Sequence, residues 1–240
     1  MSKAICPHCA TQFEITPLEE VLNPTVSITR NQIGRSSWQD IAELVRGGYS
    51  YRLFDIGDTV SFKLKDGTDF AMDVAGFNIY GDNTVVLVAH DCLPNEHFMN
   101  RQNTYGSGGW KNCDMRKYLN QDLLSLFPDD LVEVVKPRQI IQKIDGTEYD
   151  SIDKLWLPSQ TEMFKNSACD IDVGDKHLPL FSGECSRVKE RKGKTWYWWL
   201  RTPSFSAGIG NVVRFVSPAG SLNGTNAYGS GGVAPACVIG

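Results

Sequence analysis

The residues with the clearest chemical spacing lie at the start of the chain, where Cys6-Pro7-His8-Cys9 brings two thiols close together. Such a pair is half of a tetrahedral zinc site, whose second pair usually follows about 15–20 residues later. The next cysteine is Cys92, so zinc at Cys6 and Cys9 needs His8 or a second chain to complete its coordination. We favour a flexible arm with two exposed thiols, and keep zinc as a candidate cofactor with a role in assembly.

The histidines and glycines form no catalytic pattern along the sequence. No nucleophile stands at a suggestive spacing from any histidine, and we predict a structural pair where His90 adjoins Asp91. The glycine-rich run 106–109 lacks the Gly-Lys-Ser/Thr ending of a phosphate-binding loop. The histidines are His8, His90, His97 and His177.

Three alternating carboxylates, Asp170, Asp172 and Asp175, have a spacing that suits a hard cation such as calcium. The segment lacks the full twelve-residue calcium loop and its closing glutamate. We therefore expect a solvated acidic loop here.

Composition limits the possible partners. A hydrophobic fraction of 41% and a charged fraction of 22% are typical of a globular protein with a core. The net charge of −4 argues against nucleic acid as the main partner, because phosphate binding needs a basic surface.

No apolar run is long enough to span a bilayer, and the first residues lack the apolar stretch of a secretion signal. We expect a cytoplasmic site of synthesis and reduced thiols for the seven cysteines.

The chain divides into an arm over residues 1–35, interrupted by prolines, and a domain over 36–240. Ser36 or Ser37 can cap a helix whose apolar side chains share one face from Trp38 to Val45. An antiparallel meander is predicted for 59–89, and a strand for 138–144. Ser159 and Glu162 have the spacing of a capping box.

The C-terminal part combines an aromatic strand with two stretches of small polar residues. Trp196 to Arg201 predicts a strand, since three tryptophans in four positions cannot all stay hydrated. The polar stretches cover 204–211 and 217–231, separated by a strand at Val212 to Val216 and followed by a buried strand over 233–239. These stretches bury too little apolar area to form a core, so we predict loops presented by a rigid scaffold.

The segments Trp198-Trp199-Leu200-Arg201-Thr202-Pro203 and Gly232-Val233-Ala234-Pro235-Ala236 resemble the W-W-L-R-S-P … G-V-R-P-A ending of an uncharacterised bacterial and phage domain family. Upstream, Gly108-Gly109-Trp110 and Leu157-Pro158-Ser159 agree with it, and the resemblance spans roughly 36–240. Ala234 replaces the family's arginine, which puts a structural ion pair in doubt.

This family is similar to the variable proteins of diversity-generating retroelements. The resemblance implies an α+β, C-type-lectin-like fold of the formylglycine-generating-enzyme type. It also implies a protein associated with phage, prophage or a retroelement, with a binding face for a protein or cell-surface ligand. Tyr, Ser, Gly and Asn are also typical of antibody paratopes. The predicted ligand-binding residues are Ser204, Ser206, Gly208, Ile209, Asn211, Ser217, Ser221, Asn223, Asn226, Tyr228 and Ser230.

Two alternatives stay open beside this non-enzymatic binder. One is a phage structural or assembly protein with the same fold and no diversified site, which agrees with a place on the virion. The other is an oxidase of the formylglycine-generating type, whose copper-binding cysteine pair would have to be Cys185 and Cys237. Neither cysteine stands in a matching motif, and we predict Cys237 to be a buried apolar side chain.

Overall fold

The structure, a computed structural model, describes side chains and backbone for 36–102, 105, 108–167, 169–183, 187–204 and 211–240. The backbone of two further strands, β1 (Ser2–Ile5) and β2 (Gln12–Ile15), is described as an antiparallel hairpin. Cys6, Cys9 and Cys185 lie outside the described residues, so the zinc and oxidase hypotheses are untested at these positions.

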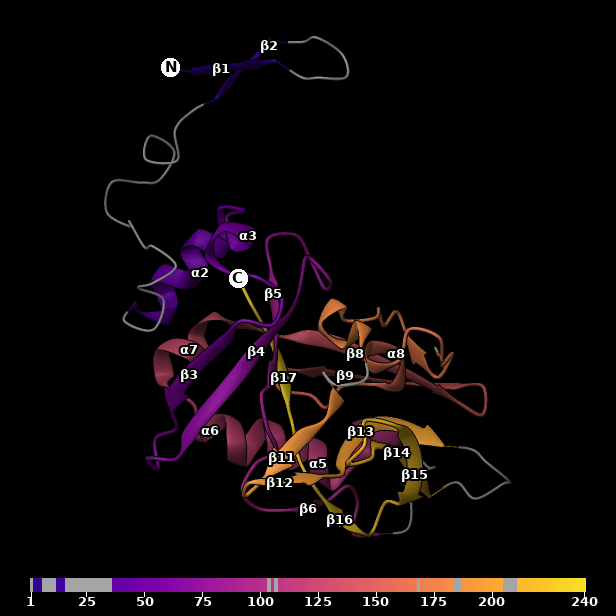
Figure 1. The fold of residues 1–240 in the computed structure, drawn as a ribbon. Coiled ribbons are helices and arrows are strands. Elements are labelled where there is room, and N and C mark those ends of the chain that lie inside the picture. Colours follow the sequence, from indigo (N-terminus) through magenta and orange to yellow (C-terminus); the bar gives the residue numbers. More distant parts are fainter. Residues whose placement is uncertain are drawn as a thin grey trace.

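The first helix of the body, α2 (Trp38–Arg46), forms as its sequence predicts. The Ser37 hydroxyl accepts a hydrogen bond from the Asp40 backbone N–H, which satisfies one of the free amides of the first turn. Trp38, Ile41 and Val45 are buried on one face, and Gly47 is the C-cap. The neighbouring helix α3 (Ser50–Leu53) completes this end of the molecule (Figure 1).

The largest sheet has five strands in the order β3-β4-β5-β17-β7, and every pairing in it is antiparallel. β3 (Thr59–Lys63), β4 (Asp69–Phe77) and β5 (Val85–Ala89) are the predicted meander. β17 (Ala236–Ile239), the predicted closing strand, is buried between β5 and β7 (Val135–Lys136), so the end of the chain supplies a central strand (Figure 1).

Two three-stranded sheets flank this centre, in the orders β10-β8-β9 and β13-β14-β15. β8 (Arg138–Ile144) has the predicted bounds. The members of these sheets and the remaining short elements are β6 (His97–Phe98), α4 (Gly109–Asn112), α5 (Asp114–Lys117), the π-helix Tyr118–Leu123, α6 (Leu124–Leu126), α7 (Asp129–Val134), β9 (Thr147–Asp153), α8 (Gln160–Met163), β10 (Asp172–Val173), the 3₁₀ helix Pro179–Ser182, β11 (Lys189–Arg191), β12 (Lys194–Trp196), β13 (Trp198–Ser204), β14 (Val212–Val216), β15 (Leu222–Asn226) and β16 (Ser230–Gly231).

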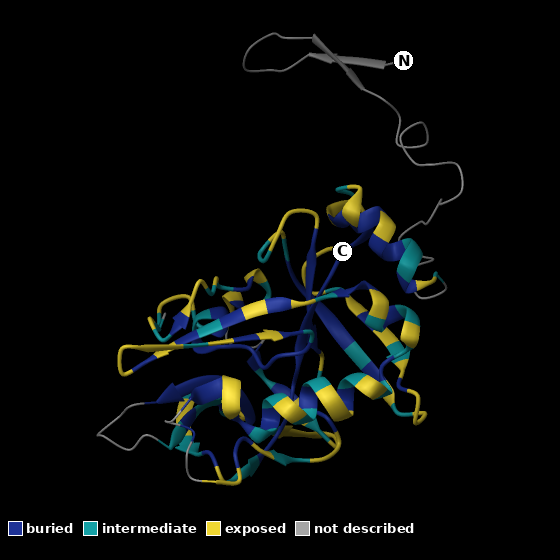
Figure 2. Ribbon diagram, turned by 180° about the vertical axis from the view of Figure 1, so that it is seen from behind, coloured by how far each residue is buried: buried dark blue, intermediate teal, exposed yellow. Residues whose placement is uncertain are grey.

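The architecture is α+β, with short helices and mostly antiparallel strands. One apolar core runs from Trp38 in α2 to Ile239 in β17. Figure 2 shows the central strands as buried, with exposed residues along the outer sides of the helices and in the turns. Among the described residues, no helix is long and apolar enough to cross a membrane.

Candidate binding face

The base of the C-terminal sheet is β13, in which all seven residues are buried. The indole N–H of Trp198 donates to the Arg187 carbonyl at 3.0 Å, and that of Trp199 donates to the His97 carbonyl at 3.0 Å. These bonds satisfy the polar atom of each buried indole. Trp196, predicted to share this strand, lies instead in β12 and is half-buried. The strand is therefore a fixed base for its neighbours.

The outer strands of this sheet are β14, which pairs with β13, and β15, which pairs with β14 and lies at the edge. Phe215 in β14 packs edge-on against Tyr197 and Trp199, with ring centroids 5.3 and 6.5 Å away. At the far end of the hairpin, the Ser217 N–H donates to the Ser221 carbonyl at 2.8 Å, and the Ser221 N–H donates to the Ser217 hydroxyl at 3.1 Å. The turn before β15 is thus closed by its own hydrogen bonds.

The exposed surface of this hairpin is small and polar, with one aromatic side chain. Ser221 and Asn223 are exposed, and Asn226 is half-buried. Tyr228 is 50% exposed, and its hydroxyl accepts a hydrogen bond from the Asn226 side-chain amide at 3.1 Å. We call the edge of the sheet formed by Ser221, Asn223, Asn226 and Tyr228 the C-terminal face.

The side chain of Arg201 in β13 belongs to a buried network of charges. Its Nη1 lies 2.6 Å from Glu162 Oε2, and its Nη2 also bonds to Asp175. Arg138 in β8 reaches Glu162 Oε1 at 2.8 Å and bonds to Asp175 as well. Asp172 lies 3.8 Å from Arg201 Nε. Two guanidinium groups thus face three carboxyl groups.

With fewer guanidinium groups than carboxyl groups, the pKa of one carboxyl group is lowered and those of the other two are raised. Burial raises the pKa of Glu162, but the charges of Arg201 and Arg138 outweigh burial and lower it to about 2. Burial raises the pKa of Asp175 to about 7, against the opposing effect of Arg201. It raises the pKa of Asp172 as well. The prediction of a solvated acidic loop was wrong for Asp172 and Asp175, because both are buried against the arginines.

The capping box is confirmed, and its glutamate is shared with this network. The Ser159 hydroxyl accepts from the Glu162 N–H at 3.2 Å, and Glu162 Oε2 accepts from the Ser159 N–H at 2.7 Å. Tyr80 also donates to Glu162 Oε1 at 2.6 Å. Glu162, which was predicted from the capping-box pattern alone, therefore also holds β13 in place through Arg201.

The predicted binding residues fall into three groups. Ser206, Gly208 and Ile209 lie outside the described residues. Ser204 was predicted to be on the binding face, but it is 3% exposed at the end of β13, so this expectation was wrong. The third group is brought together by the hairpin and the turn after it, and comprises Asn211, Ser217, Ser221, Asn223, Asn226, Tyr228 and Ser230.

The second polar stretch was predicted to be a loop, but it contains β15 and β16. Small polar residues have a low intrinsic preference for strands. Here the backbone of β14 pairs with this segment and holds it in a strand. At Gly224, a Cβ atom would come within 3.0 Å of Val212 Cγ1, so a side chain there would press on β14. The face is therefore built on a strand rather than on a free loop.

Comparison with known proteins gives a family. The family model for a domain of unknown function, DUF6273, matches residues 82–240, which is more than half of the chain. The chain belongs to the DUF6273 family. Its matched region contains β13 to β17 and the C-terminal face. No curated protein and no solved structure matched the chain.

The helix α2 and the strands β3 and β4 precede the matched DUF6273 region, but they belong to the same body. β4 pairs with β5 from Met72 to Phe77, and the Trp38 ring packs edge-on against Phe62 with centroids 5.7 Å apart. The DUF6273 domain of this chain is thus completed by residues before position 82.

One aromatic side chain beside the C-terminal face was missed from the sequence. Phe98 in β6 is 43% exposed and is the strand partner of Ser230 in β16. The Arg101 guanidinium lies 6.0 Å from its ring centroid. β6 has only two residues, so its sequence carries no periodic signal that could have revealed this pairing.

The described residues also bear on the expectations for metal ligands and cysteines. No group of three or more histidine, cysteine or acidic residues among them is arranged to hold a metal ion. Cys237 is fully buried in β17, as predicted, and burial raises its pKa to about 12. Ala234, in place of the expected arginine, is fully buried too.

Proposed function

We propose that this DUF6273 domain is a binding protein, not an enzyme, and that it recognises a protein or cell-surface ligand through the C-terminal face. The observation that carries the proposal is the contrast across β14. On one side lies the buried β13, and on the other lies β15, with exposed Asn223 in the strand and exposed Ser221 directly before it. Surfaces with this composition give adaptable hydrogen bonds around an aromatic contact, here Tyr228.

We further propose a C-type-lectin-like fold and diversification of the C-terminal segment, as the sequence resemblance implies. The α+β architecture with antiparallel strands agrees with the former. The latter predicts, near the gene, a reverse transcriptase and a near-copy of the codons for Trp199 to Ala236. Finding neither would remove diversification and leave a fixed binding face, or the phage assembly role.

The experiment is a library randomised at Asn211, Ser221, Asn223, Asn226 and Tyr228, scored separately for folding and for binding. Because these side chains are exposed or half-buried, most members should fold and their binding profiles against a panel of candidate partners should diverge. The matched control randomises buried positions of β13, Trp198 and Leu200, and should lose cooperative unfolding. Aggregation of most members of the first library would overturn the proposal.

A further inference from the structure

A second candidate site, separate from the C-terminal face, lies around His90 just after the end of β5. Two hollows, of about 510 and about 530 Å³, share His90 and Asp91 in their walls. Both volumes fall within the range of small-molecule sites, roughly 300–1,000 Å³. His90 therefore stands between two neighbouring spaces of useful size.

The imidazole of His90 is held in one orientation. Its Nδ1 lies 2.8 and 2.9 Å from the two carboxylate oxygens of Asp73 in β4. The Thr59 hydroxyl donates to the same carboxylate at 2.6 Å. An ionised carboxylate only accepts, so Nδ1 carries the proton and, in the neutral ring, Nε2 is left as an acceptor. His90 was predicted to pair with its neighbour Asp91, but its hydrogen-bond partner is Asp73 in β4.

Acidic groups dominate the hollow between β4 and β11. Asp73, Asp91 and Glu190 line it, together with Lys189. Lys189 is 1% exposed, and its ammonium donates to the backbone carbonyls of Ala89 and His90. The three carboxylates outnumber the single ammonium, that of Lys189, in the walls of this hollow. This end of the site therefore favours a positive charge.

Apolar side chains form part of the remaining walls. Leu180 and Val188 line the acidic hollow. The other hollow is lined by Ala71, Leu93 and Pro94, and also by the exposed ion pair of Lys63 with Asp69. An apolar body placed there would remove these apolar surfaces from water, which favours binding. The site thus combines a negatively charged rim with apolar walls.

We propose that these hollows form a binding site for a small molecule that carries a protonated amine on an apolar body. The ammonium group lies between Asp91 and Glu190 and donates to His90 Nε2, while the body fills the space beside Leu180 and Val188. This site is independent of the C-terminal face, so either proposal can fail without the other.

The test uses three probes of similar shape on the full chain: 2-phenylethylamine, which is protonated at pH 7, the neutral 2-phenylethanol, and the anion phenylacetate. Each is titrated while the backbone amide resonances are followed by NMR. The amine should shift the amides of His90, Asp91 and Glu190, with an affinity at least tenfold higher than the other two probes. Equal affinities, or shifts only elsewhere, would overturn the proposal.

Two variants locate the charge. Glu190→Gln and Asp91→Asn together should lower the affinity for the amine about tenfold and leave that for the alcohol unchanged, because both carboxylates that face the ammonium lose their charge. The amide introduced by Asp91→Asn keeps an oxygen for the Glu190 N–H, from which the Asp91 carboxylate accepts at 2.7 Å. Glu190 is exposed, so Glu190→Gln alone tests the idea if the double variant fails to fold.

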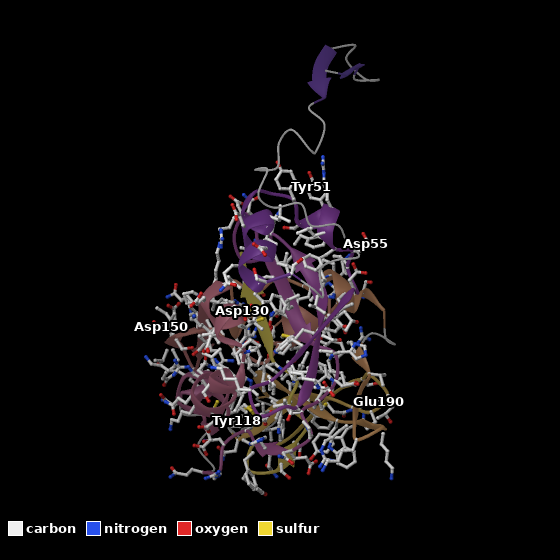
Figure 3. The ribbon with its side chains drawn as sticks, turned by 90° about the vertical axis from the view of Figure 1, so that its left-hand side faces the viewer. Tyr51, Asp55, Tyr118, Asp130, Asp150 and Glu190 are labelled. Atoms are coloured by element: carbon white, nitrogen blue, oxygen red, sulfur yellow. The ribbon has the colours of Figure 1, made fainter. Side chains whose placement is uncertain are left out.

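The control is Asp150→Asn, which removes an exposed carboxylate at the opposite margin of the body from Glu190 (Figure 3). It should leave the affinity for the amine unchanged. Should it weaken binding as much as Glu190→Gln does, the effect would be one of net charge, and the site would be wrongly placed.

Discussion

The strands on the two sides of β14 differ in what they can tolerate. β13 is buried along its whole length, and the Arg201 Nη1 and Trp199 Nε1 atoms find their hydrogen-bond acceptors inside the protein. β15 pairs with the same β14 but lies at the sheet edge, and none of its five residues is buried. One backbone ladder thus joins a segment that fixes the fold to a segment free to vary. Under the proposed function, the single strand β14 separates the segment that stabilises the fold from the segment that binds the ligand.

The variant expected to lose the most stability is Arg201→Met, in β13. Removing the guanidinium leaves Glu162, Asp172 and Asp175 buried with only Arg138 nearby. Breaking a buried ion pair from one side costs about 3–5 kcal/mol, and we expect the upper end. Urea unfolding of the variant measures this loss. The exposed control Arg101→Met should stay within about 0.5 kcal/mol, and equal effects of the two would contradict the role of the network.

Trp199→Ala tests the aromatic part of the same strand. Truncating a fully buried tryptophan costs about 3–5 kcal/mol, a large share of the roughly 5–15 kcal/mol that holds a domain together. The melting temperature and the denaturant midpoint should both fall. A variant that melts like the parent and loses only a ligand would place Trp199 on the binding surface instead.

The charge imbalance predicts a pH dependence. The folded-state pKa of Asp175 is raised to about 7, above its unfolded value, so between about pH 4 and pH 7 the folded state binds more protons at this site. The contribution of Asp175 to stability therefore falls as pH rises through this window, by at most about 1.4 kcal/mol per pH unit. Unfolding of the parent and of Asp175→Asn, compared at pH 5 and pH 7, isolates it. An identical pH dependence in both proteins would show that Asp175 does not titrate there.

Glu162 should act in the opposite direction. Its folded-state pKa is lowered to about 2, so its contribution to stability is present above its unfolded value near pH 4 and is lost as pH falls toward 2. Acid unfolding of Glu162→Gln should therefore lack part of the parent's loss of stability below pH 4. The two carboxyl groups can be told apart by pH range alone.

On the exposed side, Tyr228→Ala should change the free energy of unfolding by no more than about 0.5 kcal/mol, since half of the side chain is exposed. If Tyr228 is the central contact of a ligand, the same change should weaken binding by about 2 kcal/mol or more. Thermal melting beside a binding measurement separates the two. A large drop in melting temperature would make Tyr228 a scaffold residue.

The smallest expected effect is that of deleting residues 1–34. Their polar, proline-interrupted sequence contributes little apolar surface, and the core of the described residues begins at Trp38. The melting temperature should be nearly unchanged. Loss of cooperative unfolding would show that the arm belongs to the domain, and zinc content of the full chain would then be measured.

Local pattern was enough to determine several elements from the sequence. The cap at Ser37, the capping box at Ser159, the strands of 59–89 and the strand Val212 to Val216 each depend on side chains that are close in sequence. The burial of Trp198, Trp199 and the closing strand follows from their apolar character. Such features need no knowledge of the partner segment.

Only the tertiary structure decided the rest, because it depends on pairings between distant positions. Asp172 and Asp175 are buried through Arg201, 26 residues beyond Asp175, and the polar stretch after Ser217 becomes a strand because β14 lies beside it. Phe98 is brought beside Ser230, two residues after Tyr228, by the pairing of two-residue strands. His90 turns toward Asp73 across the sheet rather than toward its neighbour. A buried charge or a polar strand is stabilised by the residue or strand packed against it. That partner lies far away in the sequence, so local sequence pattern does not identify it.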